Sequence, residues 1–114
     1  MKKQYRLKKN WEFDRVLKSK NQLINKYLIV YYVDSKSFKC GLTCPKKFIN
    51  SVGRNFHKRQ LRAILNDLNL TDLNHEFVFI IRKAFIDEND FWKKHKAIAQ
   101  MLEKLKDAKQ QQKK

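Results

Sequence analysis

The sequence has few of the residues that build phosphate-binding loops and zinc sites. Its two glycines, Gly41 and Gly53, lie far apart, so it contains no glycine-rich phosphate loop. Its two cysteines, Cys40 and Cys44, have no second pair, and the three histidines show no ligand spacing around them. We therefore predict no zinc site, and we expect two buried thiols in a reducing compartment.

Long hydrophobic runs and acidic residues are also scarce. No segment approaches the roughly 18 apolar residues of a membrane-spanning helix, and no apolar signal-peptide region follows Met1. We therefore expect no membrane partner and a cytoplasmic location. The 11 acidic residues are scattered and mostly mark predicted helix caps and turns. We predict no catalytic residue, and no metal or cofactor bound by the protein's own side chains.

Positive charge is abundant, and it is carried by an apolar framework. The chain has 27 Lys and Arg against 11 Asp and Glu, a formal net charge of +16. Its 42% hydrophobic content is too high for a disordered basic tail. We predict one RNA-binding domain over residues 1–114, with a basic N-terminal arm at 1–9 and a frayed tail at 107–114. Nucleic acid is the expected partner of such a domain.

The hydrophobic pattern predicts an α+β domain with a single small sheet and packed helices, in the order α-β-β-β-α-β-α. Strands are predicted at residues 27–33 and 38–44, and the turn between them would pair them antiparallel. A short third strand is possible within 46–51. Residues 76–82 form another strand, which is apolar enough to be central in the sheet.

Three helices complete the prediction. Their expected caps are Asn10, Ser51 and Asp87, and the second helix runs to about Asn66. The first helix presents Phe13, Val16 and Leu17 on its apolar side. The last carries a stripe at helical spacing that indicates core packing, made of Phe91, Trp92, His95, Ile98, Ala99, Leu102 and Leu105.

The second helix has one basic face and one apolar face. Its basic face carries Arg54, Asn55, Lys58, Arg59, Arg62 and Asn66, and the opposite face His57, Leu61, Ile64, Leu65 and Leu68. Like charges at this spacing destabilise a helix by roughly 0.2–0.5 kcal/mol per pair, so helix stability does not explain the pattern. Phosphate binding does, because Arg and Lys pair with phosphates and release counterions. A merely solvated face usually mixes both signs and is the weaker interpretation.

Aromatic side chains provide a second indication of nucleic-acid binding. Phe13 and Tyr31 would lie close together if the first helix packs across the sheet. An open sheet face with such rings and nearby lysines is a platform on which unpaired bases stack. The alternative, that both rings are ordinary core residues, fits the sequence equally well.

Several motifs together resemble one known family. Lys46-Lys47, Arg54-Asn55, Lys58-Arg59 and Arg62 are similar to the signature of the protein subunit of bacterial ribonuclease P. Three flanking segments also resemble it: Arg6-Leu7-Lys8-Lys9 followed by Phe13 and Val16, Gly41-Leu42-Thr43, and Ile80-Ile81-Arg82-Lys83. The resemblance covers roughly residues 5 to 105.

The resemblance implies a ribonucleoprotein endonuclease that removes the 5′ leader of precursor tRNA, in which Mg²⁺ and the hydrolysis belong to the RNA subunit. It also implies a left-handed β-α-β crossover through the basic helix, and no DNA partner. Contacts with the catalytic RNA are implied for Lys46, Arg54, Asn55, Lys58, Arg59 and Arg62. A cleft for the single-stranded leader is implied for Phe13, Tyr31, Thr43 and Lys47.

Five positions depart from the usual residues of that family, and one of them is Ala84, where proline often follows the Arg-Lys pair. Phe56 takes the third place of an Arg-Asn-Arg motif, and Ile49 stands where glycine is common. Pro45 replaces a small polar residue, and Leu17 stands where an aromatic residue often lines the cleft.

Three other classes of protein were weighed. A ribosomal-type RNA-binding protein without turnover would share the charge and size, and it is the main alternative. A helix-turn-helix DNA-binding protein would need a second helix shortly before the basic one, where the sequence predicts a strand. A self-sufficient nuclease would need acidic residues that converge, and the acids here are scattered.

Overall fold

The computed structural model describes residues 6–7, 9–19, 21–70 and 73–112. Its elements follow the chain as α1 (Asn10–Leu17), β1 (Gln22–Ile24), β2 (Leu28–Asp34), β3 (Lys39–Thr43), α2 (Ser51–Leu68), β4 (His75–Ile81), α3 (Lys83–Asp87) and α4 (Phe91–Gln112). The predicted α+β class and element order are confirmed, with the short helix α3 as an addition before the last helix.

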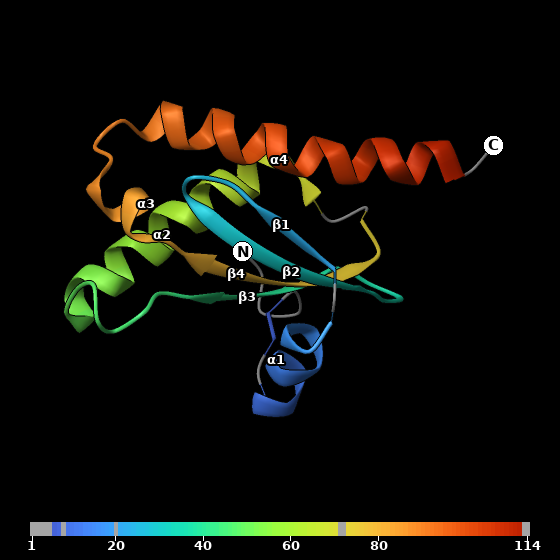
Figure 1. The fold of residues 1–114 in the computed structure, drawn as a ribbon, viewed down its shortest axis with the longest axis horizontal. Coiled ribbons are helices and arrows are strands. Elements are labelled where there is room, and N and C mark those ends of the chain that lie inside the picture. Colours follow the sequence, from blue (N-terminus) through green and yellow to red (C-terminus); the bar gives the residue numbers. More distant parts are fainter. Residues whose placement is uncertain (1–5, 8, 20, 71–72, 113–114) are drawn as a thin grey trace.

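The four strands form one sheet in the order β1-β2-β4-β3 (Figure 1). β2 is antiparallel to both β1 and β4, whereas β3 is parallel to β4. The prediction that residues 38–44 pair with the first predicted strand is wrong, because β4 lies between β2 and β3. β3 and β4 are joined through α2, and this is the β-α-β crossover that the resemblance implies.

The third strand of the predicted order is not where the sequence indicated. Residues 46–51 contain a turn and the start of α2, so the strand predicted there is wrong. The additional strand is β1, which lies in a stretch predicted as a loop and pairs Leu23 with Val30 of β2. This strand has three residues, and Leu23 is the one that packs against the core. A stretch this short is too brief to show a detectable alternation of polar and apolar residues.

Helices cover the two faces of the sheet unequally. Among the described helices, α2 and α4 pack on one face and α1 packs on the other (Figure 1). Because strand residues alternate between faces, Leu28, Val30, Phe77 and Phe79 enter the larger core while Val78 faces α1. The sheet is therefore the middle of three layers.

The caps of the two long helices differ from the predicted ones. Asn50 caps α2 and Asp90 caps α4, each accepting a hydrogen bond of 2.9 Å from a backbone N–H of the first turn. Ser51 is the first helical residue instead, and Asp87 ends α3. The predicted Asn10 cap is also wrong, since Lys9 precedes α1 with extended backbone. Several cap-forming residues lie close together at each start, and the pattern alone does not choose between them.

Parts of the predicted arm and tail belong to described structure. Residues 1–5 and 8 of the predicted arm lie outside the described residues, but Leu7 is buried and its N–H donates to the Cys40 carbonyl at 3.0 Å. α4 continues to Gln112, through most of the predicted frayed tail, because residues 104–112 are good helix formers without Gly or Pro. Residues 113–114 lie outside the described residues.

The stripe predicted on the last helix is confirmed in part, since His95 and Ala99 are only half-buried. Ile98, Leu102 and Leu105 are buried, and Phe91 packs against the core from its edge. The prediction that Trp92 packs in the core is wrong, because its side chain is 67% exposed.

Candidate nucleic-acid interface

α2 is held on the molecule by its apolar face. His57, Leu61, Ile64 and Leu65 are buried as predicted. A hydrogen bond from α4 adds to this packing: Lys94 Nζ donates to Gln60 Oε1 at 2.6 Å.

Lys94 itself is buried, and its Nζ lies 4.4 Å from the centroid of the Phe85 ring of α3. Burial lowers the pKa of Lys94, while Glu88 acts in the opposite direction. The orientation of α2 is therefore fixed from three sides, by the sheet, by α3 and by α4.

The basic face of α2 points away from this core. Asn55 and Arg59 are exposed, and Arg54, Lys58 and Arg62 are half-buried. The ion pairs found among the described residues are Arg15–Glu76, His75–Asp34 and His95–Asp67, and none involves these cations. Within the described part of the chain, the basic face is therefore not neutralised by the protein's own carboxylates.

The backbone of α2 adds to this positive potential. Its first turn contains no acidic residue and its last turn no basic residue. Such residues usually offset the helix dipole, which places partial positive charge at the N-terminus. Arg54 lies near that positive end, so the start of α2 is arranged to attract anions.

Arg62 shows how crowded the basic face is. Burial lowers the pKa of Arg62 from its ordinary value, and the neighbouring Arg6 and Arg59 lower it further. Because the guanidinium stays charged at neutral pH, these cations repel one another. A bound phosphate would relieve that repulsion.

The two cysteines lie beside the basic face without taking part in redox pairing. Burial raises the pKa of Cys40 to about 12, although Arg62 and Arg6 act in the opposite direction. Burial likewise raises the pKa of Cys44, against Lys58 and Arg54. Both thiols are buried and neutral at pH 7, and neither forms a disulfide. Because Cys40 belongs to β3, these neighbours also place the basic face along the β3 edge of the sheet.

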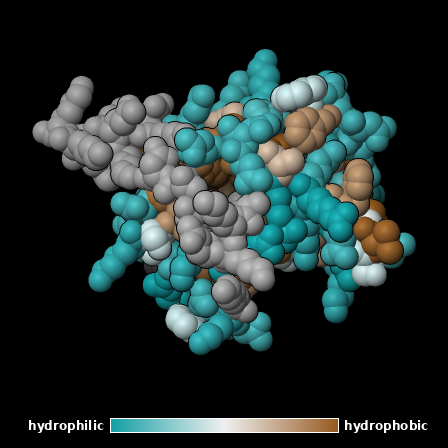
Figure 2. Space-filling model, turned by 180° about the vertical axis from the view of Figure 1, so that it is seen from behind, coloured by the Kyte–Doolittle hydropathy of each residue, from teal (hydrophilic) through white to brown (hydrophobic). Residues whose placement is uncertain are grey.

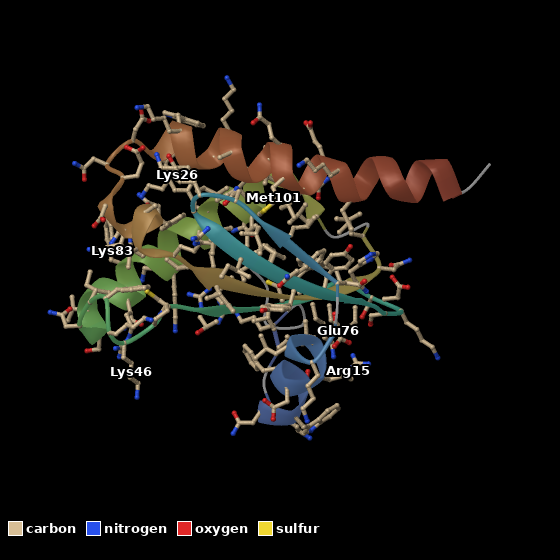
Figure 3. The ribbon with its side chains drawn as sticks, in the orientation of Figure 1. Arg15, Lys26, Lys46, Glu76, Lys83 and Met101 are labelled. Atoms are coloured by element: carbon tan, nitrogen blue, oxygen red, sulfur yellow. The ribbon has the colours of Figure 1, made fainter. Side chains whose placement is uncertain are left out.

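The segment before α2 carries exposed cations and two of the unusual residues. Lys46 and Lys47 are exposed, and Figure 3 shows Lys46 at the end of the molecule where α2 begins. A Cβ atom on Gly53 would lie 2.3 Å from Ile49 Cδ1. Ile49 therefore packs directly on Gly53. Pro45, which directly precedes Lys46, is half-buried.

Hydrophobic side chains are exposed at the same end of α2. Phe56 is 59% and Val52 78% exposed. Figure 2 shows that the rear face is mostly hydrophilic, with hydrophobic atoms at the edge where α2 begins. Phe56 is therefore a surface residue beside the basic face, where its ring is accessible to a ligand.

The opposite face of the sheet brings the predicted cleft residues together. Phe13 and Tyr31 pack in one cluster between α1 and the sheet. The Phe13 ring lies directly over Gly41, where an added Cβ atom would come within 2.3 Å of Phe13 Cε1. Tyr31, Val78 and Gly41 form one row across three strands.

A hollow of about 380 Å³ continues this face past the end of α1. Its apolar side chains include Ile29 and Ile80, the next row of the sheet, and Ile80 is the register partner of Thr43. Its cations are Lys26, Lys47, Arg82 and Lys83. Phe13, Tyr31 and Thr43 thus share one face, and Lys47 lies at its rim. Leu17 is 38% exposed.

Sequence reasoning missed several residues of this hollow. Ile29 could have been found, since it alternates with Tyr31 along β2. Lys26 and Arg82 come from separate loops, and no local pattern brings them together. Their arrangement depends on tertiary contacts such as the hydrogen bond of 2.7 Å from Arg82 Nη1 to the Asn25 carbonyl oxygen.

An ion pair fixes α1 against its face of the sheet. Arg15 pairs with Glu76, and Ser35 Oγ donates to the same carboxylate at 3.0 Å (Figure 3). Glu76 is 8% exposed, so removing Arg15 would leave a buried carboxylate without its ion pair. On this face of the sheet, α1 is therefore held by the ion pair at Glu76, and the hollow lies at the row of Ile29 and Ile80.

Comparison with known proteins agrees with this geometry. The family model described as Ribonuclease P matches residues 1–106. The chain belongs to the ribonuclease P protein family. It is 62% identical over 89 residues to the ribonuclease P protein component of Mycoplasmopsis synoviae, covering 78% of this chain and 80% of that protein. It is 49% identical over 110 residues to that of Mycoplasmopsis pulmonis, covering 96% and 98%.

The fold agrees with a solved structure. The RNase P protein of Staphylococcus aureus superimposes with a TM-score of 0.78 at 27% identity, covering 90% of this chain and 95% of that one. The family is the protein subunit of the ribonucleoprotein nuclease ribonuclease P, and ribonuclease P RNA is its partner. The ribosomal-type alternative is thereby replaced. In the described part of the chain, the residues before α2 form β3 and a turn, so a helix-turn-helix is also absent there.

Among the described residues, neither a cluster of metal ligands nor a membrane-spanning helix is present. No group of three or more His, Cys, Asp or Glu side chains is placed to hold a metal ion there. None of the helices found in that part of the chain is long and apolar enough to cross a membrane.

Proposed function

We propose that this chain promotes removal of the 5′ leader from precursor tRNA by binding two RNAs on two surfaces. The catalytic RNA contacts the basic face of α2 and the exposed segment before it, through Lys46, Arg54, Asn55, Lys58, Arg59 and Arg62. The single-stranded leader lies in the cleft between α1 and the sheet, against Phe13, Tyr31, Thr43 and Lys47.

The observation that carries this proposal is the unneutralised basic face of α2. Its cations lie at the positive end and along the side of one helix, and they do not pair with carboxylates in the described residues. A face that costs helix stability and meets no internal partner is suited to an external polyanion.

The two surfaces meet at β3, which suits a shared task. The basic face runs along that edge strand, and Phe13 covers Gly41 of the same strand from the other side of the sheet. An RNA held on α2 and a strand in the cleft would therefore lie close together. The protein would reduce the repulsion between catalytic RNA and substrate and orient the leader.

We propose that the protein's contribution is binding and orientation. Mg²⁺ held by the RNA subunit would supply the hydrolytic chemistry, and no side chain of this chain is assigned a catalytic role. The leader would be bound mainly by stacking and backbone charge, hence with modest sequence preference. The absence of a DNA partner and the cytoplasmic location stay predictions.

Reconstitution tests the proposal. The purified chain is added to a bacterial ribonuclease P RNA at low Mg²⁺, where the RNA alone cleaves poorly, and leader removal from precursor tRNA is measured. Restored cleavage at the mature 5′ end supports the proposal. Failure of a folded chain to restore it, or cleavage by the chain without the RNA, would contradict it.

A further inference from the structure

A second groove lies at the opposite edge of the sheet from the basic face of α2. It has a volume of about 500 Å³ and runs between the β1–β2 hairpin and α4. Figure 3 shows two of its residues, Lys26 and Met101, on this side of the molecule. Because the strand order is β1-β2-β4-β3, the groove borders β1 while the basic face of α2 borders β3.

The groove is pre-formed. Asn25, in the turn between β1 and β2, donates from Nδ2 to the Ala97 carbonyl oxygen of α4 at 3.3 Å. Its Oδ1 accepts hydrogen bonds of 2.8 Å from the backbone N–H groups of Tyr27 and Leu28. The turn is thus tied to the helix, and a ligand would meet a fixed shape.

Four lysines line this groove: Lys26, Lys93, Lys96 and Lys104. Lys96 and Lys104 are two turns apart on one side of α4, about 12 Å along its axis. No carboxylate of the described residues lies within 4.0 Å of any of the four amino groups. The spacing allows these cations to meet successive negative groups of one extended ligand.

Two acidic residues lie near the groove. Glu88, at the Lys26 and Lys93 end, accepts a hydrogen bond of 2.9 Å from the Tyr27 hydroxyl, which lowers the pKa of Glu88, and Lys93 and Lys26 lower it further. Glu103 faces the other side of α4, where it lines a hollow together with Asp67. No acidic residue of the described part of the chain lines the groove itself, so its four lysines give it positive charge.

The surface between the lysines is apolar. Ile24 is 55% exposed, unusual for a strand residue of its size, and Met101, which is 5% exposed, also lines the groove. The volume is within the range of about 300–1,000 Å³ typical of ligand pockets. An apolar surface bordered by cations matches a nucleotide strand, whose bases need apolar contact and whose phosphates need positive charge.

We propose that this groove is a further RNA site, which binds a stretch of single-stranded RNA with its bases against Ile24, next to Met101, and its phosphates on Lys93, Lys96 and Lys104. The site is separate from the basic face of α2. Lys26 also lines the hollow of the leader cleft, so a strand could pass from one to the other around the β1–β2 turn.

Methyl NMR of the full chain tests the site directly. With Ile and Met methyl groups labelled, a short oligouridylate is titrated, and the signals of Ile24 and Met101 are followed. We expect saturable shifts of both, with a similar affinity in the Arg54→Ala/Arg59→Ala variant. Lys96→Glu should weaken this binding about tenfold, because it reverses a charge at the phosphate positions.

Lys36→Glu is the matched control, since it makes the same charge change at an exposed turn between β2 and β3. It should change the affinity much less. The methyl spectrum checks that Lys96→Glu is folded, and Lys104→Gln, a milder change, should weaken binding in the same direction.

Three results would overturn the site: unmoved Ile24 and Met101 signals, equal losses for Lys96→Glu and Lys36→Glu, or equal shifts with inorganic tripolyphosphate, which would leave the apolar surface unused. If leader removal is restored but the methyl signals do not move, the groove site is contradicted and the proposed function still stands. Saturable methyl shifts without reconstituted cleavage would retain this site and contradict the proposed function.

Discussion

The face of the sheet that meets α2 and α4 is built from fully buried apolar side chains, whereas the face beneath α1 mixes apolar, hydroxyl and charged ones. Leu28, Phe77 and Phe79 on the first face are 0% exposed. On the second face, Tyr31 and Thr43 are half-buried and Glu76 is held in an ion pair. The same strands contribute to both, by alternation.

This difference separates stability from binding. The first face is covered by the two long helices α2 and α4, which bury its centre. The second is covered by one helix of 8 residues and continues into an open hollow. Substitutions on the first face should therefore unfold the protein, and substitutions on the second should impair RNA binding in a folded protein.

The largest expected effect is a loss of stability from a substitution on the sheet face that meets α2 and α4. Phe77→Ala should lower the free energy of unfolding by about 3–5 kcal/mol, because it opens a cavity between the rings of Phe38 and Phe79. Urea denaturation measures it. A loss similar to that of Phe13→Ala, a half-buried ring on the other face, would contradict the contrast between the two faces.

The next effect is on leader binding. Phe13→Ala should weaken binding of precursor tRNA by about 1–3 kcal/mol, or roughly 5- to 150-fold, because a base loses its stacking partner. Binding of mature tRNA to the holoenzyme should be unchanged. Equal losses for both RNAs would remove Phe13 from the leader cleft.

Gly41→Ala should act through the same ring. The added Cβ would displace Phe13, at a cost of about 1–3 kcal/mol for overpacking, and would reduce leader binding. In the double variant with Phe13→Ala, the added Cβ should cost less, since the ring it strikes is gone. A double-mutant cycle by urea denaturation measures this coupling. Strictly additive losses would show that the two residues do not touch.

The smallest expected effect is a pH dependence of stability that arises from His57, on the buried side of α2. Burial lowers the pKa of His57, and the nearby Lys94 lowers it further. The unfolded chain therefore binds a proton near pH 6.5 that the folded chain does not, so stability should fall as the pH drops below about 6.5. The loss of stability stops once the pH falls below the pKa of His57 in the folded protein. His57→Phe should reduce this slope in urea denaturation at pH 7 and pH 5, and an unchanged slope would assign it to other groups.

The sequence predicted the parts of the fold that depend on local pattern. The two faces of α2 follow from helical periodicity, and β2 and β4 from runs of β-branched and aromatic residues. The pairing of β3 was missed, because strands that follow one another across a turn usually pair, and no local signal shows that β4 inserts between them. β1 was missed because three residues with one core contact carry no pattern.

The site divides in the same way. The basic face could be predicted because a single helix carries it. The contact of Phe13 with Gly41 and the hollow beside Ile80 join residues from separate elements, and these depend on the strand order. The resemblance supplied the cleft residues Phe13, Tyr31, Thr43 and Lys47, and their RNA contacts stay predictions.

The most direct test is the salt dependence of binding to ribonuclease P RNA. For Arg54→Ala/Arg59→Ala, the slope of log affinity against log salt should become shallower by about 1.4–1.8, because two phosphate contacts are lost. Lys18→Ala/Lys36→Ala removes the same charge from exposed positions outside α2 and should leave the slope nearly unchanged. An unchanged slope for the α2 variant, or an equal change in both variants, would contradict the claim that the basic face of α2 binds the catalytic RNA.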